Sequence, residues 1–113
     1  MNVTDRPDQE PPAAATEIDD AELIDMADLF SALGDTTRLR LLIALMDGPL
    51  CVNDLVARCA VSESAVSHQL RSLRLQRLIA PQRSGQKVYY SLNDEHVSEL
   101  VRLCLDHVRE VWR

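Results

Sequence analysis

The sequence predicts one mainly α-helical domain with a small two-stranded β-hairpin. Its 113 residues are enough for a single domain and too few for two. Only 4% of the residues are aromatic and 3 are glycines, which disfavours an all-β sandwich or a glycine-rich phosphate loop. Apolar residues recur at helical spacing along most of the chain, and at a spacing of two in one short segment.

Charge is distributed unevenly along the chain. Residues 1–35 hold ten acidic residues and one arginine, whereas residues 36–113 carry a net charge of +3 and residues 61–90 carry +4. The total charge of −6 therefore conceals a modest basic patch, which is compatible with a DNA partner. The polar, proline-bearing residues 1–16 are expected to form a disordered acidic tail before a folded domain at 17–113.

Two helices are predicted at the start of the folded domain. Apolar residues recur at helical spacing from Ile18 to Leu33, and Gly34 is expected to end this helix in a left-handed conformation. Thr36 or Thr37 can cap a second, short helix. That helix is expected to end at the breaker sequence of residues 47–49, Asp-Gly-Pro.

A helix-turn-helix is predicted by two amphipathic segments joined by three residues. Apolar positions fit a helix from Val52 to Cys59, and residues 60–62 form the connection, with Ser62 capping the next helix. One face of that second helix is apolar, whereas the opposite face carries no acid. This outer face consists of Ser64, Ser67, His68 and Arg71.

A β-hairpin and a final helix complete the predicted domain as a winged helix-turn-helix. Apolar and polar residues alternate from Lys87 to Leu92, and residues 83–86 are expected to form the hairpin turn. Asn93 or Asp94 can cap the final helix. A wide apolar stripe on this helix indicates that it packs against a partner, such as a second copy of the chain. It consists of Val97, Leu100, Val101, Cys104, Leu105, Val108 and Val111.

The final helix also carries the patterns Asp94-x-His96 and His107-x-x-Glu110, whose four side chains can all bind zinc. The eleven residues from His96 to His107 correspond to about 16 Å of helix, too far for one metal ion with bonds of about 2 Å. Two copies packed antiparallel about a two-fold axis near Arg102 would instead form two symmetric interchain sites. Two imidazoles and two carboxylates suit Zn²⁺ or Co²⁺ and disfavour Cu(I).

Cysteine content and hydropathy indicate the compartment. Cys51, Cys59 and Cys104 contain no Cys-x-x-Cys pair, which argues against a disulfide framework and a four-thiolate zinc site. There is no apolar run of about 18 residues, and the acidic first twenty residues do not resemble a secretory signal. We therefore expect a cytoplasmic protein with reduced thiols and no membrane partner.

These segments resemble the ArsR/SmtB family of bacterial metal-responsive repressors, and in particular its zinc-sensing branch. The resemblance extends from about Ala21 to Glu110 and implies a homodimer that represses metal efflux or sequestration genes. It also implies release from an inverted-repeat operator when Zn(II) binds between the last helices. The matching segments are Ala32–Leu42, Leu50–Leu55, Val61–Arg74 and Gly85–Tyr90, together with Asp94, His96, His107 and Glu110 in the places of the family's last-helix zinc ligands.

The resemblance also assigns residues to DNA. The outer face of the second helix of the helix-turn-helix would read base edges in the major groove, through Ser64, Ser67, His68 and Arg71. Arg83 and Lys87 on the wing would contact phosphates. The two copies of this helix in a dimer would meet half-sites about 34 Å apart. A hypothesised route of communication runs from the second ring nitrogen of His107 to backbone near His68.

A second metal site of the family is matched only in half, by Cys51 and Asp54. Residues 1–35 contain no cysteine or histidine to complete it, so this site is expected to be vestigial or absent. The three cysteines are then expected to be small core residues.

Three other interpretations stay open, although we expect a protein that is not an enzyme. A small metallohydrolase would need an open metal position, which four protein ligands do not leave. A thiol-based redox repressor would pair Cys51 with Cys59 or Cys104. A constitutive DNA-binding module would carry the four metal-binding side chains only as a vestigial site or as solvated surface residues.

Overall fold

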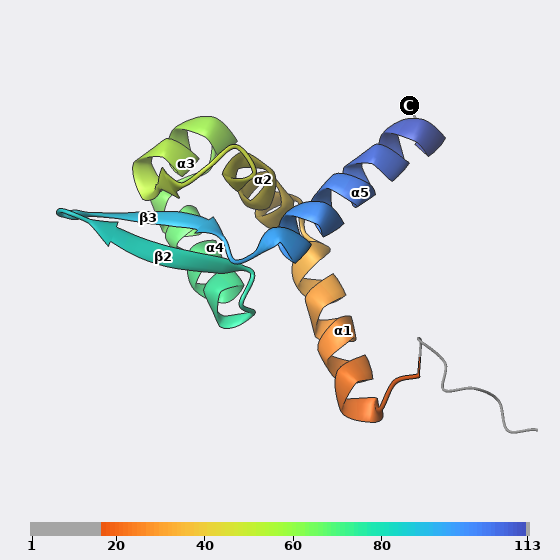
Figure 1. Ribbon diagram of the computed structural model, residues 1–113. Helices are drawn as coiled ribbons and strands as arrows, with labels where there is room; N and C mark the ends of the chain where they lie inside the picture. The colour runs from red at the N-terminus through yellow and green to blue at the C-terminus, as the bar shows by residue number, and fades with distance from the viewer. Residues whose placement is uncertain (1–16, 113) are drawn as a thin grey trace, which may run out of the picture.

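A computed structural model describes residues 17–112, so the predicted disordered tail at 1–16 lies outside the described residues. Five helices and three strands follow one another in this part of the chain (Figure 1). They are α1 (Asp20–Leu33), α2 (Thr36–Leu45), β1 (Leu50–Cys51), α3 (Val52–Cys59), α4 (Glu63–Leu75), β2 (Ile79–Ser84), β3 (Lys87–Leu92) and α5 (Glu95–Trp112). Within 17–112, no helix is both long and apolar enough to cross a membrane.

The strands form one antiparallel sheet in which β3 lies between β1 and β2. In the short β1, Leu50 lies opposite Tyr90 and Cys51 opposite Tyr89. The predicted two-stranded hairpin is present as β2 and β3. The additional strand β1 was not predicted, because two residues are too few to show an alternating pattern. This third strand connects the start of α3 to the middle of β3.

The hairpin turn is tighter than predicted. Arg83 and Ser84 belong to β2, and Ser84 pairs with Lys87, so that Gly85 and Gln86 alone connect the strands. Gly85 has a φ of 64°, a left-handed conformation that glycine adopts without a steric penalty. The turn brings the cationic side chains of both strands close to the tip of the wing.

The boundary between α1 and α2 differs from the prediction at two positions. The side chain of Asp35 caps α2 by accepting a hydrogen bond from the backbone N–H of Arg38 at 3.0 Å. The predicted cap at Thr36 or Thr37 was therefore wrong, because an acceptor of equal or greater strength stands just before them. Gly34 has a φ of −82°, so its predicted left-handed conformation was also wrong.

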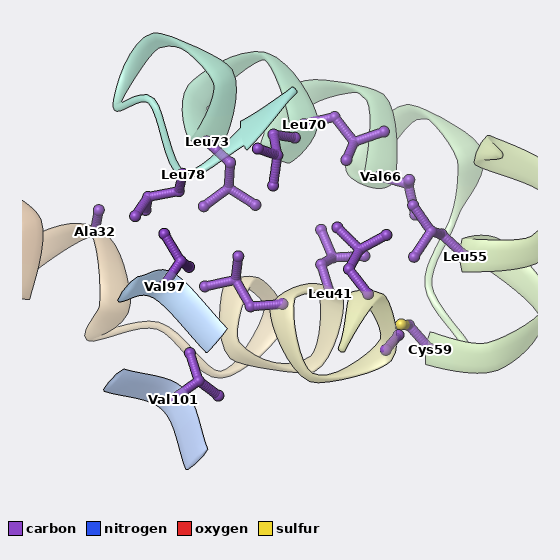
Figure 2. Packing of buried hydrophobic residues seen from close by; sticks show 14 residues of the cluster. Ala32, Leu41, Leu55, Cys59, Val66, Leu70, Leu73, Leu78, Val97 and Val101 are labelled. Atoms are coloured by element: carbon purple, nitrogen blue, oxygen red, sulfur yellow. The ribbon is translucent and has the colours of Figure 1, made fainter. Parts of the chain in front are cut away.

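The hydrophobic core fills the space between α2, α4 and the first half of α5. Figure 2 shows Val97 and Val101 of α5 at one end of this core and Leu55 and Cys59 of α3 at the other. Each large apolar side chain buried here contributes about 1.5–3 kcal/mol. The core therefore fixes the orientation of α4 and anchors the start of α5.

Two helices extend beyond this core with apolar side chains uncovered. Figure 1 shows α1 and the second half of α5 projecting from the body in different directions. Such exposed apolar patches mark sites of association. The exposed apolar residues on these two helices are Leu23, Ile24, Met26 and Phe30 of α1, and Leu103, Val111 and Trp112 of α5.

Candidate metal centre and nucleic-acid interface

The face of α4 that points away from the core is exposed. The hydroxyl of Ser62 caps this helix by accepting from the N–H of Ala65 at 3.1 Å, as the sequence predicts. Residues 60–62 connect α3 to α4, in agreement with the predicted turn. With Val66, Leu70 and Leu73 buried, the helix presents to solvent the four side chains predicted to read DNA: Ser64, Ser67, His68 and Arg71.

The wing adds cations beside this helix. Arg83 and Lys87 are exposed near the tip of the hairpin. An open hollow of about 220 Å³ separates α4 from β3, and both Arg71 and Arg74 line it, together with Tyr90. Sequence reasoning missed Arg74, although its spacing of three residues from Arg71 places both on one side of a helix. The arrangement offers a basic recess between α4, which is the candidate recognition helix, and the wing formed by β2 and β3.

The first carboxylate–imidazole pair meets at the start of α5. Asp94 Oδ1 caps the helix by accepting from the N–H of Val97 at 3.1 Å, and it lies 3.6 Å from His96 Nδ1. Two ligands of a tetrahedral zinc ion with bonds of about 2.0–2.1 Å lie roughly 3.3–3.4 Å apart. The spacing of Asp94 and His96 is close to this value, and the side chain of His96 is 91% exposed. The donor types and the spacing of this pair therefore fit zinc.

The second pair lies near the other end of the same helix. His107 and Glu110 are exposed, and their spacing of three residues places them on one face of α5. Because α5 is continuous from Glu95 to Trp112, about 16 Å separate His96 from His107 along its axis. No group of three His, Cys, Asp or Glu side chains within 17–112 of one chain could hold a metal ion. The structure thus brings Asp94 and His96 close together, places His107 and Glu110 on one face of α5, and keeps the two pairs apart.

The predicted contact from the second ring nitrogen of His107 to backbone near His68 stays a prediction.

Leu103 is a residue of α5 that the predicted apolar stripe omitted. It is seven residues after His96 and four before His107, so it shares their helical face. Its side chain is 69% exposed in the single chain. The signal was present in the sequence, but the stripe was drawn through Val97 and Val101, which face the core of the same chain. The face that carries the metal-binding side chains therefore has an apolar centre.

Cys51 and Asp54, the residues of the predicted second metal site, are in contact with each other. The thiol and the backbone N–H of Cys51 both donate to Asp54 Oδ2, each at 3.2 Å. These two hydrogen bonds hold the pKa of the Asp54 carboxyl below its usual range, and the charges of Lys87 and Arg58 act in the same direction. The contact holds the first turn of α3 together, and this accounts for both residues without a metal.

The cysteines are arranged unfavourably for a disulfide switch. Cys51 and Cys59 are buried at the two ends of α3, about 12 Å apart along its axis, whereas a disulfide needs Cα atoms within about 7 Å. Burial raises the pKa of the Cys59 thiol and so reduces its reactivity. Cys104 is exposed, so its predicted place in the core of the chain was wrong. The geometry removes the Cys51–Cys59 form of the redox interpretation.

Comparison with known proteins agrees with this architecture. A family model described as "Bacterial regulatory protein, arsR family" matches residues 35–80, which include the whole helix-turn-helix. The solution structure of a homodimeric winged helix-turn-helix DNA-binding domain from Mycobacterium bovis, a possible ArsR-family transcriptional regulator, is similar with a TM-score of 0.78 and 25% identity. The similarity covers 88% of this chain and 94% of that one.

Two relatives are similar in sequence. The "Transcriptional repressor SmtB homolog" of Synechocystis sp. is 59% identical over 85 residues, which are 75% of this chain but only 64% of that protein. The "Cadmium resistance transcriptional regulatory protein CadC homolog" of Staphylococcus aureus is 40% identical over 89 residues, 78% of this chain and 74% of that protein. These relatives are transcriptional regulators, which confirms the prediction that the chain is not an enzyme. The chain belongs to the ArsR/SmtB family of metal-responsive transcriptional repressors.

Proposed function

We propose that this protein is a zinc-responsive repressor that binds an inverted-repeat operator as a homodimer. Zn(II) bound between the α5 helices of the two chains releases the operator and derepresses metal efflux or sequestration genes. In this proposal the domain at residues 17–113 provides both the DNA-binding and the dimerisation surface, and the protein acts in the cytoplasm.

The arrangement of α5 carries this proposal. Two metal-binding pairs stand at opposite ends of one continuous helix, with the exposed Leu103 between them. When a second copy is packed antiparallel, Asp94 and His96 of one chain meet His107 and Glu110 of the other, twice per dimer. The exposed apolar residues of α1 extend the same interface. Zinc would then supply a cross-link between the chains at both ends of the helix pair.

The chemistry of the ligands supports zinc among divalent metals. Two imidazoles and two carboxylates form a tetrahedral N/O site, and the 3.6 Å spacing of Asp94 Oδ1 and His96 Nδ1 is close to one edge of a zinc tetrahedron. Cadmium, named in one relative, and cobalt are the competing effectors. Zinc is preferred here because no thiolate belongs to the set.

In the operator complex, the two cationic surfaces should act differently. Arg71 projects from the recognition helix and is proposed to contact base edges, so Arg71→Ala should weaken operator binding by about 5- to 150-fold and relax sequence preference. Lys87 is proposed to contact a phosphate. Lys87→Ala should therefore weaken binding to all DNA sequences about equally, and should lower the slope of log affinity against log salt concentration by about one. Fluorescence anisotropy at several salt concentrations, on operator and scrambled DNA, measures both effects. Equal losses on both DNAs for Arg71→Ala would contradict base reading.

The release step is tested by titrating zinc into the operator complex. Anisotropy of a labelled inverted-repeat fragment from upstream of the gene should show that zinc weakens binding by the native chain tenfold or more, because typical coupling free energies reach 1–3 kcal/mol. His96→Ala should bind the operator normally and not respond to zinc. Glu95→Ala, which alters an exposed neighbour outside the ligand set, serves as the matched control and should respond like the native chain. A zinc-independent native affinity would refute the proposed function.

A further inference from the structure

The side chain of Arg38, on α2, joins three helices. Its Nη1 donates to the backbone carbonyl oxygens of Ser31 and Ala32, at 3.3 and 3.2 Å, in the last turn of α1. Its Nε donates to Oε1 of Gln69 at 2.9 Å, in the middle of α4. One guanidinium group therefore connects the helix that carries exposed apolar residues to the recognition helix.

The α1 end of this connection is electrostatically favourable. The last carbonyl groups of a helix lack partners within the helix and carry a partial negative charge. The last turn of α1 contains no basic residue, so Arg38 supplies the compensating cation from the next helix. The backbone of Arg38 is itself fixed, because its N–H donates to Asp35 at 3.0 Å. The Arg38 residue is thus held at both ends, at its backbone by Asp35 and at its guanidinium group by the last turn of α1.

The α4 end of the connection fixes the orientation of a side-chain amide. Arginine has only donors, so Gln69 must turn its carbonyl oxygen toward Arg38 and keep its NH₂ group for other acceptors. Gln69 directly follows His68, which faces solvent on the proposed DNA-binding side. Gln69 is half-buried, and its hydrogen bond to Arg38 therefore restrains rotation of α4 about its own axis.

We propose that Arg38 is a positioning residue that sets the recognition helix relative to α1 and thereby sets the separation of the two recognition helices in the dimer. The inference rests on the proposed function, because it requires a dimer on an inverted repeat with α1 in the interface. Without the Arg38–Gln69 hydrogen bond, each recognition helix can turn relative to the dimer interface. The dimer should then discriminate less between half-site spacings.

The test compares operator fragments whose half-sites have the native spacing or are moved apart by one or two base pairs. Anisotropy gives the ratio of affinities for each spacing with the native chain, Arg38→Met, Gln69→Met and the double variant. Gln69→Met should lose about tenfold in affinity at the native spacing, and Arg38→Met at least as much, because it also removes the hydrogen bonds to Ser31 and Ala32. The double variant should lose no more than Arg38→Met, because the Arg38–Gln69 hydrogen bond is already absent in that single variant. Arg40→Met removes an equal charge from an exposed position on the same helix and should behave like the native chain.

The spacing ratio is the affinity at the native half-site spacing divided by the affinity at an altered spacing. It distinguishes a positioning role of Arg38 from a purely structural role and from a direct DNA contact by Gln69. Thermal unfolding and sedimentation confirm that each variant is a folded dimer, and if Arg38→Met does not fold, the spacing ratio of Gln69→Met decides. A reduced ratio supports the inference. An unchanged ratio, or additive losses in the double variant, would overturn it while leaving the proposed function intact. A native chain that binds no inverted repeat at any spacing would overturn both.

Discussion

Mixing the His96→Ala and His107→Ala chains should restore a zinc response that neither variant shows alone. In a dimer of either variant, both interchain sites lack a histidine. In a mixed dimer, one site loses both histidines, but the other is assembled from intact Asp94 and His96 of one chain and intact His107 and Glu110 of the other. Zinc-dependent loss of operator anisotropy should therefore reappear on mixing, and each mixed dimer should bind one zinc ion tightly.

The matched control mixes His96→Ala with Asp94→Ala. Both substitutions fall in the same half of the site, so every site in every dimer is damaged and no response should return. Exchange of chains is checked by a size or affinity tag on one variant. Sites formed within one chain, or from the same ends of two chains, would give no rescue in the first mixture, and that result would refute the antiparallel arrangement of α5.

Leu103→Glu should convert the protein to a monomer and abolish tight operator binding. An antiparallel pair of α5 helices with its two-fold axis near Arg102 brings Leu103 of both chains close to that axis. Two carboxylates would then be buried near each other, a cost of several kcal/mol. Because a monomer engages only one half-site, operator affinity should fall about a hundredfold or more. Sedimentation equilibrium measures the mass, and anisotropy measures the affinity.

Arg109→Glu is the control for this substitution. Residue 109 is exposed, about two turns from the two-fold axis and about 120° around the helix from Leu103, so the same carboxylate is introduced away from the proposed contact. It should leave the dimer intact. A Leu103→Glu chain that stays dimeric would show that the interface lies elsewhere, for example on the exposed apolar face of α1 alone.

Periodicity was sufficient to predict the helices and the wing. The helices α2, α3 and α4 and the start of α5 each bury one regular face against the core, whereas most apolar residues of α1 stay exposed. Spacing alone predicted the exposed side of α4, since a helix that buries Val66, Leu70 and Leu73 must present Ser67 and Arg71 outward. The capping contact of Asp94 at the start of α5 also followed from local sequence.

The remaining features depend on contacts between distant segments. The third strand forms only because Leu50 meets Tyr90, forty residues later. Likewise, nothing local in the sequence shows that Arg38 reaches Gln69, 31 residues away. The apolar stripe of α5 combined two faces, since periodicity shows that a helix is amphipathic but not which side its own domain covers. Leu103 and Cys104 were misjudged for this reason.

The central claim is that zinc binding and operator binding to the dimer weaken each other. Its most direct test is to measure the zinc affinity of the dimer with and without saturating operator. Thermodynamic linkage requires that the operator weaken zinc binding by the same factor by which zinc weakens operator binding. Competition with a chromophoric zinc chelator measures this factor. The account predicts equal factors of tenfold or more, both lost in His96→Ala. A zinc affinity that is the same in the presence and absence of operator would contradict it.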